Sequence, residues 1–526
     1  MQGMTLRKPW PLPAALLLIL CLLPACPATP PPADALTPAL DRILDAPALR
    51  GGVTGAVVVR VRDGAVLYSH SPDVRLLPAS NRKLFTAAAA LAALGDDFRF
   101  VTQVRATALP NANGELSGSL VLRGAGDGAL TVSDLEDLAA QVARAGVRRV
   151  TGGVAGDGTL FSDGPYGFGW EWDDLSDEEF PQISALEVAH GDVRVRVTAA
   201  RAPGQPAQVA LTPDIGFPPV VVSARTVAAG GANTCAVVCP YDQSFVRVSG
   251  DLPLGKTLEQ NVPVARPSHY AALVFADALR RRGVVVEGQT IEGDVLGAAG
   301  VVLATHASLP LSQYLPVMMK PSDNLIAESL VRTLGVVRGG GLGTYAAGHA
   351  VETPCFQALG VDTTALDLRD GCGVSRRDFV TARAITQLLR GMAGRPDWRF
   401  FYDSLPVAGV DGTLKSRMAG TRAAGNVHAK TGTLSQVRCL SGYLTARNGD
   451  LYVFSLLMNN FPGDAKSAGA VQDAFVERLA DALLKTSIFL SQHCWGLWHN
   501  GQERNQLHSA PGENHVHVRP NVWVRA

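Results

Sequence analysis

Two hairpin patterns lie at opposite ends of the chain, and they constrain the fold more than any other feature. Near the N-terminus, strand patterns over 56–62 and 65–70 flank Asp63-Gly64, a dipeptide typical of tight hairpin turns. Near the C-terminus, strand patterns over 437–446 and 451–459 flank Asn448-Gly449. An isolated hairpin is marginally stable, so we expect the two hairpins to form one antiparallel sheet packed against helices, an α+β fold. Helical patterns cover 78–95, 268–282, 312–335, 381–392 and 465–484.

The stretch 96–264 has a different texture from the rest of the chain. Short strand patterns alternate there with turns rich in Gly, Asn and Asp, and one helical pattern over 133–145 opens with the capping-box sequence Ser133-x-x-Glu136. We therefore predict one or two β-rich inserted domains over 96–264, which interrupt a single domain formed by 36–95 and 265–485.

The two termini are set apart from this domain. Arg7 and Lys8 precede the short apolar run 14–23, a pattern typical of an export signal over 1–28. The run ends near Cys26 in a sequence similar to a lipoprotein signal, so lipidation of Cys26 and simple cleavage nearby both stay open. The last 41 residues, 486–526, hold five of the 11 histidines and are expected to form an unstructured tail. The mature protein is expected to be periplasmic or otherwise outside the cytoplasm, with membrane contact only through a lipid at Cys26.

Charge and cysteine content narrow the function further. The chain has 526 residues with 47 basic and 47 acidic side chains, which gives no support for a nucleic-acid partner. Cys235 and Cys239 are close enough in sequence to form a small disulfide, with two free thiols as the alternative. No histidines pair with the cysteines at the spacing of zinc ligands, so neither a metal nor another cofactor is expected.

One helical pattern carries a candidate nucleophile. Ser80 lies three residues before Lys83 at the predicted start of the helix 78–95, which places both side chains on one face. Only eight of the 47 basic residues are lysines, and arginine cannot give up its proton at working pH. A lysine kept beside a serine therefore suggests a base that activates a nucleophile. Taken alone, Ser-x-x-Lys is a weak signal.

Two further motifs follow in order. Ser322-x-Asn324 precedes a helical pattern, and Lys430-Thr431-Gly432-Thr433 lies on an expected edge strand. Together with Ser80-x-x-Lys83 they are the signature of penicillin-recognising serine acyl enzymes.

That signature assigns a role to each motif residue. We expect Ser80 to form an ester, Lys83 to take its proton, and Ser322 to relay a proton to the leaving amine. Asn324 would contact the substrate amide and hold Lys83. Lys430, Thr431 and Thr433 would clamp a terminal carboxylate, Gly432 would let a peptide lie alongside the strand, and the N–H groups of Ser80 and Thr433 would form the oxyanion hole.

At this point the chain resembles one family, the class C low-molecular-mass penicillin-binding D-alanyl-D-alanine carboxypeptidases/endopeptidases (peptidase family S13). Longer strings are also similar to recurring segments of that family: Gly169–Asp173, Ile183–Leu186, Asp370–Arg376 and Leu405–Leu414. The resemblance implies an acyl-enzyme domain with a two-part insertion. It also implies cleavage of D-Ala from peptidoglycan pentapeptides and of cross-linked muropeptides, and inhibition by β-lactam antibiotics.

Two positions depart from the family pattern. Cys372 stands where a small residue such as serine is usual, which suggests a mildly nucleophilic thiol near the cleft. An acidic residue is expected near position 189 to reach the side-chain amine of the substrate, and Asp192 either substitutes for it or the contact is missing. Two other functions stay open: a β-lactamase or esterase on the same scaffold, and a non-catalytic peptidoglycan-binding scaffold.

Overall fold

The computed structural model describes residues 36–297, 300–341 and 343–482 of the chain. The predicted export signal over 1–28, with Cys26, and the predicted tail over 486–526 lie outside these residues. Within the described part, every helix is too short or too polar to cross a membrane.

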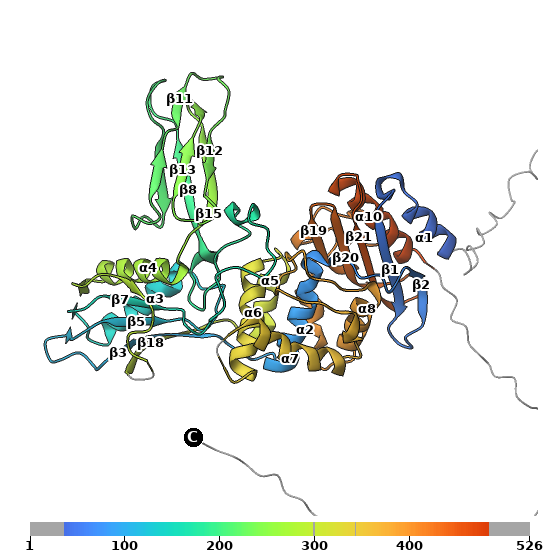
Figure 1. Cartoon of the computed structure of the whole chain (residues 1–526), viewed down its shortest axis with the longest axis horizontal. Coiled ribbons are helices and arrows are strands. Elements are labelled where there is room, and N and C mark those ends of the chain that lie inside the picture. Colours follow the sequence, from blue (N-terminus) through green and yellow to red (C-terminus); the bar gives the residue numbers. More distant parts are fainter. Residues whose placement is uncertain (1–35, 298–299, 342, 483–526) are drawn as a thin grey trace, which may run out of the picture. The chain divides into compact units, whose positions relative to one another are not determined.

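A five-stranded antiparallel sheet joins the two ends of the described chain (Figure 1). Its strands, in spatial order, are β19 (His428–Leu434), β20 (Val437–Thr445), β21 (Leu451–Asn459), β1 (Val53–Arg60) and β2 (Val66–His70). The two predicted hairpins meet where β1 pairs with β21, in a register that sets Val57 opposite Ser455. The predicted single sheet and the α+β class are therefore confirmed.

Helices cover both faces of this sheet, because its central strands are apolar on both sides. Along β1, Ala56 and Val58 pack on one face and Val57 and Val59 on the other. The first face packs against α1 (Leu36–Leu44) and α10 (Ala465–Ala480). The second face packs against α8 (Ala382–Ala393), and its core continues through α2 (Arg82–Leu94), α5 (Leu311–Met319), α6 (Asn324–Arg338), α7 (Tyr345–Ala358) and α9 (Trp398–Ser404). Short 3-10 turns complete this part at Pro47–Leu49, Ala79–Asn81, Thr363–Ala365 and Gly412–Leu414.

The inserted region has its own hydrophobic core. One part holds α3 (Val132–Arg144) and α4 (Pro267–Arg281) with two small sheets. The first sheet contains β17 (Ile291–Glu292), β7 (Val154–Asp157), β5 (Leu120–Arg123), β3 (Val101–Ala106) and β18 (Val301–Ala307); the second contains β16 (Val285–Val286), β6 (Arg149–Val150) and β4 (Glu115–Leu116).

The other part of the insertion consists of strands. Its three sheets are β15 (Thr257–Pro263) with β8 (Asp192–Thr198) and β9 (Gln208–Thr212); β10 (Val220–Val222) with β13 (Val246–Ser249) and β12 (Ala236–Val238); and β11 (Arg225–Val227) with β14 (Asp251–Pro253). Two 3-10 turns, Asp174–Ser176 and Ala189–Gly191, lie in the segment that leads into β8.

Two local predictions differ from the structure, and the open alternative for Cys235 and Cys239 is decided in favour of free thiols. The insertion does not end at 264: α4 packs in the inserted core, and β18 pairs with β3 through Ala307 opposite Val101. Residues 267–307 therefore belong with the insertion, and the domain that contains the five-stranded antiparallel sheet resumes near Leu311. The capping box of α3 is formed by Thr131 and Asp134. Cys235 and Cys239 are both free, and the Cys239 thiol donates to the Pro263 carbonyl instead of forming a disulfide.

Candidate active site

Ser80 lies on a tight turn that leads directly into α2. The turn Ala79–Asn81 is a single 3-10 turn, and α2 continues from Arg82 to its stop at Gly95. Ala79 has a φ of +45°, a left-handed conformation that is unusual for a residue with a side chain and is often found at functional sites. The alanine-rich helix behind the turn is buried from Arg82 to Leu91, because small side chains let neighbouring helices approach closely.

Lys83 faces the serine from the first turn of α2 and is fully buried. Its Nζ donates to Ser80 Oγ at 3.0 Å, to Asn324 Oδ1 at 2.7 Å and to the Cys372 carbonyl at 3.1 Å. Three acceptors thus surround the amine, and one of them is the predicted nucleophile. The predicted contact of Asn324 with Lys83 is present, while its amide Nδ2 donates to the Glu179 carbonyl of the insertion at 2.8 Å.

A second lysine approaches from the opposite side. Lys430 on β19 is fully buried, and its Nζ donates to Ser322 Oγ at 2.8 Å and to the Thr431 carbonyl at 3.1 Å. Burial lowers the pKa of Lys430 well below its usual value, and the charge that Lys83 carries when protonated lowers it further. Ser322 has a φ of +73°, in the loop between α5 and α6.

The edge strand β19 lies directly against the turn that carries Ser80. Asn81 Nδ2 donates to the Lys430 carbonyl at 3.1 Å, which ties the turn to the strand. A Cβ on Gly432 would stand 2.8 Å from the Pro78 carbonyl and 3.0 Å from the Ala79 Cβ, so only glycine fits this approach without a shift. Thr431 donates its hydroxyl to Thr413 Oγ1 at 2.7 Å, and Thr433 accepts a hydrogen bond from Arg438.

These groups open onto one polar cavity of about 660 Å³. The motif residues Ser80, Ser322, Asn324, Thr431, Gly432 and Thr433 line it. The insertion supplies a strongly acidic wall with Glu171, Asp173, Asp174 and Glu179, and Arg376 also lines the cavity and pairs with Glu171 at 3.3 Å. Burial raises the pKa of Asp174, and the neighbouring carboxylates of Asp173 and Glu171 add to that effect.

The structure corrects the prediction for Cys372. Its thiol is fully buried 3.5 Å from Asp370 Oδ2, and burial raises the pKa of the thiol well above its usual value, with the charges of Asp370 and Glu328 acting in the same direction. A thiol in such surroundings is inert. The part of Cys372 that reaches the site is its backbone carbonyl, which contacts Lys83.

Asp192 faces a neighbouring cavity of about 390 Å³, which also touches Ser322 and Asn324. Burial raises the pKa of the Asp192 carboxyl to about 8, and the charge of Glu178 contributes. His190 lines the same cavity and contacts Asp323 at 2.8 Å. The role predicted for Asp192 stays a prediction.

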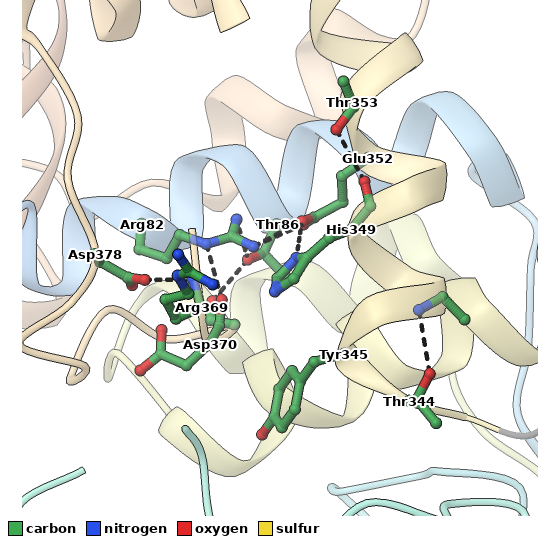
Figure 2. A network of polar contacts seen from close by, with 12 residues as sticks. Arg82, Thr86, Thr344, Tyr345, His349, Glu352, Thr353, Arg369, Asp370 and Asp378 are labelled. Atoms are coloured by element: carbon green, nitrogen blue, oxygen red, sulfur yellow. Dashed lines mark hydrogen bonds and ion pairs between the residues drawn. The ribbon is translucent and has the colours of Figure 1, made fainter. Parts of the chain in front are cut away.

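A buried charged network packs against the helix that follows Ser80 (Figure 2). Arg82, next to Lys83, donates from Nη2 to both carboxylate oxygens of Glu352 at 3.0 and 2.7 Å and from Nε to the Asp370 carbonyl at 2.9 Å. His349 contacts the same carboxylate at 2.8 Å. Figure 2 shows these side chains meeting between α2 and α7.

Three buried ligand-type atoms cluster beside this network, those of Glu328, Asp370 and Cys372. N–H groups already occupy the carboxylates: Glu328 accepts from Gly371 and Cys372, and Asp370 accepts from Gly373 and Ser375. The cluster is therefore a hydrogen-bonded support for the segment 370–376.

Sequence reasoning missed the Cys372 carbonyl, Glu328, Thr413, Arg376 and Glu179. The sequence does carry a signal for Thr413, Cys372 and Arg376, because they lie in the segments Leu405–Leu414 and Asp370–Arg376, which resemble the family. Glu179 contacts Asn324 through its backbone carbonyl, a group that every residue has. Glu328 is an acidic residue within an apolar helical pattern, and no motif marks it.

The chain is similar to known carboxypeptidases over most of its length. The D-Ala-D-Ala carboxypeptidase 3 (S13) family matches residues 36–482. The D-alanyl-D-alanine carboxypeptidase of Actinomadura sp. (strain R39) is 42% identical over 463 residues, which cover 84% of each chain. The D-alanyl-D-alanine carboxypeptidase DacB of Haemophilus influenzae is 29% identical over 79% of this chain and 88% of its own.

A solved structure agrees with these matches. The crystal structure of penicillin binding protein 4 (dacB) from H. influenzae superposes with a TM-score of 0.73 at 27% identity, over 83% of this chain and 98% of that one. The same protein has been solved in complex with a β-lactam, and that structure superposes with a TM-score of 0.69.

Proposed function

Because the chain belongs to the D-Ala-D-Ala carboxypeptidase (S13) family and is a serine-type D-Ala-D-Ala carboxypeptidase, we propose that Ser80 is its nucleophile. Ser80 Oγ attacks the carbonyl carbon of the penultimate D-alanine, and an ester forms as the peptide bond breaks. The terminal D-alanine leaves as the amine, and water then hydrolyses the ester to regenerate the serine. The observation that carries this proposal is the 3.0 Å contact between the buried Lys83 Nζ and Oγ of Ser80, which lines the polar cavity.

Lys83 acts as the base for this attack. As a neutral amine it has one lone pair and two N–H groups, and Asn324 Oδ1 and the Cys372 carbonyl stand ready to accept from those two N–H groups. The lone pair then faces Ser80 and takes its proton. On the other side, Ser322 passes a proton to the leaving amine. Its 2.8 Å contact with Lys430, whose pKa is lowered, supports this relay.

The terminal carboxylate of the substrate binds at β19. The Lys430 ammonium supplies the positive charge, and the hydroxyls of Thr431 and Thr433 add hydrogen bonds. The backbone N–H groups of Ser80 and Thr433 hold the developing oxyanion. The close approach of Gly432 to the nucleophile turn supports this placement, because it brings the strand and the serine to the same end of the cavity.

The rest of the substrate is a peptidoglycan stem peptide. Its diamino acid carries an amine, and the wall formed by Glu171, Asp173 and Asp174 offers that amine several carboxylates. Arg376 on the same cavity suits a carboxylate of the same side chain. Cross-linked muropeptides present the same D-alanyl carbonyl, joined to the side-chain amine of a diamino acid in place of a terminal D-alanine, so DD-endopeptidase activity on them is part of the proposal. A β-lactam antibiotic acylates Ser80 in the same way, in keeping with the β-lactam complex of the H. influenzae relative.

One pair of variants tests the mechanism. Ser80→Ala abolishes both covalent labelling by fluorescent penicillin and D-alanine release from a pentapeptide. Lys83→Arg keeps a positive charge but cannot accept the proton, so labelling slows by at least about a hundredfold. Mass spectrometry of the penicillin adduct identifies the acylated residue. D-alanine release that persists in Ser80→Ala, or an adduct on another residue, contradicts the proposal.

We also propose that the enzyme works outside the cytoplasmic membrane, where its peptidoglycan substrate lies. The apolar run 14–23 after Arg7 and Lys8 supports export. The mass of the mature N-terminus tests this: cleavage before Cys26 with an added lipid supports an anchored form, and cleavage nearby without lipid supports a free form. An N-terminus that retains Met1 contradicts export.

A further inference from the structure

Glu328 is a fully buried acid one helical turn after Asn324 on α6. Its Oε1 accepts from the backbone N–H groups of Gly371 at 2.9 Å and Cys372 at 2.7 Å. Its other oxygen accepts from the Tyr345 hydroxyl on α7. One carboxylate thus binds two consecutive N–H groups of the segment that passes beside the catalytic lysine.

That segment presents a carbonyl to Lys83. The Cys372 carbonyl accepts from Lys83 Nζ at 3.1 Å, and Asn324 Oδ1 accepts from it at 2.7 Å. A neutral amine directs its lone pair only where its two N–H groups do not point. These two acceptors therefore decide whether the lone pair faces Ser80. Residues four apart on a helix lie on one face, so α6 holds the amine twice, directly through Asn324 and indirectly through Glu328.

Three hydrogen bonds anchor the two peptide planes on either side of Cys372. Glu328 binds the N–H of Cys372 on the preceding peptide plane, and Asp370 Oδ1 binds the N–H of Gly373, in the same plane as the carbonyl, at 2.7 Å. On the other side, Thr86 on α2 donates to the Gly371 carbonyl at 2.6 Å. Of these anchors, Glu328 is the one that shares a helix face with Asn324, so a shift of α6 moves both supports of Lys83 together.

We propose that Glu328 is a positioning residue for Lys83: it orients the Gly371–Cys372 peptide so that the Cys372 carbonyl takes one N–H of the amine and leaves the lone pair facing Ser80. This inference rests on the proposed role of Lys83 as the base. Glu328 touches neither substrate nor nucleophile and acts through the backbone alone.

Two substitutions of Glu328 distinguish a role that depends on the position of its oxygens from a role that depends on its charge. Glu328→Gln removes the charge but keeps an oxygen that can accept both N–H groups, and its amide can donate to the Tyr345 hydroxyl. Glu328→Asp keeps the charge but is one methylene shorter, so the carboxylate withdraws from the two N–H groups. If Glu328 acts by position, the aspartate variant is the impaired one.

Stopped-flow acylation with a reporter β-lactam measures the noncovalent dissociation constant and the acylation rate constant separately. We expect Glu328→Asp to slow acylation by about tenfold or more, with the dissociation constant within about twofold of the wild-type value, because a shift of about 1 Å in a catalytic group has effects of this size or larger. Glu328→Gln stays within about threefold of the wild-type rate. Ser329→Ala is the matched control, because Ser329 is the next residue on α6, is buried, and its hydroxyl has no hydrogen-bond partner among the residues that the structure describes.

Three results overturn the proposal: acylation at the wild-type rate in Glu328→Asp, a glutamine variant slower than the aspartate variant, or equal losses in rate constant and affinity. A role in folding alone lowers the fraction of protein that can be labelled and leaves the rate constant of that fraction unchanged, and this outcome also contradicts it. Lys83→Arg, measured alongside, separates the two proposals. If Lys83→Arg acylates normally, the base assignment fails; if it does not and Glu328→Asp does, only the role of Glu328 fails.

Discussion

At the scale of single residues, the site contains two lysines with different hydrogen-bond partners. Lys83 stands among three acceptors, whereas Lys430 is bound to Ser322 and the Thr431 carbonyl in a fully buried position. The sequence located both, since each lies in a short motif and lysine is scarce in this chain. It could not locate the third acceptor of Lys83, because a backbone carbonyl is common to every residue and only the fold determines which one faces the amine.

The pKa of Lys430 predicts how substrate affinity depends on pH. Because burial holds the pKa of Lys430 well below 10.5, the ammonium is present at low pH and is lost as pH rises through the lowered value. Since a carboxylate needs the ammonium, we expect the KM for a pentapeptide with a free terminal carboxylate to rise with pH. Steady-state kinetics over the pH range below 10.5 measure this.

Two controls accompany that measurement. The C-terminal amide of the same peptide lacks the carboxylate, so its KM should stay level. Lys430→Arg keeps its charge at all these pH values, and its KM for the free acid should also stay level. Parallel KM profiles for the acid and the amide in the wild-type enzyme would show that Lys430 does not bind the carboxylate.

At the scale of elements, the catalytic geometry depends on one close approach between the edge strand β19 and the nucleophile turn. Sequence reasoning placed both elements correctly, because the apolar patterns of the hairpins and the helix are strong. It placed the end of the insertion too early, because the helical pattern of α4 does not reveal which core the helix packs against. The capping box of α3 was predicted at Ser133 but is formed by Thr131, because both positions place a hydroxyl three residues before an acidic residue.

Gly432→Ala tests the approach of strand and turn. The new Cβ would lie 2.8 Å from the Pro78 carbonyl and 3.0 Å from the Ala79 Cβ, so β19 must move outward and carry Lys430 and Thr433 away from Ser80. We expect acylation by penicillin to slow about tenfold or more, equivalent to at least about 1.4 kcal/mol in the barrier. Gly341→Ala is the control, since a Cβ there meets nothing within 4 Å. Equal acylation rates for the two variants would mean that the strand tolerates the methyl group.

At the scale of the whole molecule, the catalytic part and the insertion share the active site. The Asn324 amide donates to the Glu179 carbonyl of the insertion, and four acidic residues of the insertion line the cavity. The buried network behind the nucleophile in turn connects α2 to α7 (Figure 2). These contacts could not be predicted from the sequence, because each joins residues more than a hundred positions apart with no shared pattern.

The buried pair Arg82–Glu352 makes a prediction about stability. Its two side chains are 0% and 1% exposed, so Arg82→Met leaves a charge unpaired in the core and should cost about 3–5 kcal/mol of unfolding free energy. The control is Arg383→Met. Arg383 pairs with Asp73 at 2.6 Å on the surface, where the two side chains are 41% and 68% exposed. This substitution should lower the unfolding free energy by less than about 1 kcal/mol. Urea unfolding at neutral pH measures both, and similar losses would contradict the argument.

The pKa of Glu352 determines how the stabilisation from the Arg82–Glu352 pair changes with pH. Burial alone would raise it, but the charge of Arg82 and the contact with His349 outweigh burial and lower it. The contribution of the pair is therefore complete at neutral pH and is lost as pH falls through the lowered pKa. The stability difference between wild type and Arg82→Met should narrow in acid.

The pairing of β1 with β21 has a consequence for the order of events during synthesis. β1 is among the first strands made, yet its partner in the sheet is among the last, with Val57 opposite Ser455. Such pairing between distant segments forms slowly and late, whereas the insertion, with its own core, can condense while the chain is still being made. Ser80 emerges early but gains the Lys430 strand only when the sheet closes. The chain therefore has a built-in delay: it should be unable to react with penicillin or peptidoglycan until its last strands have been released.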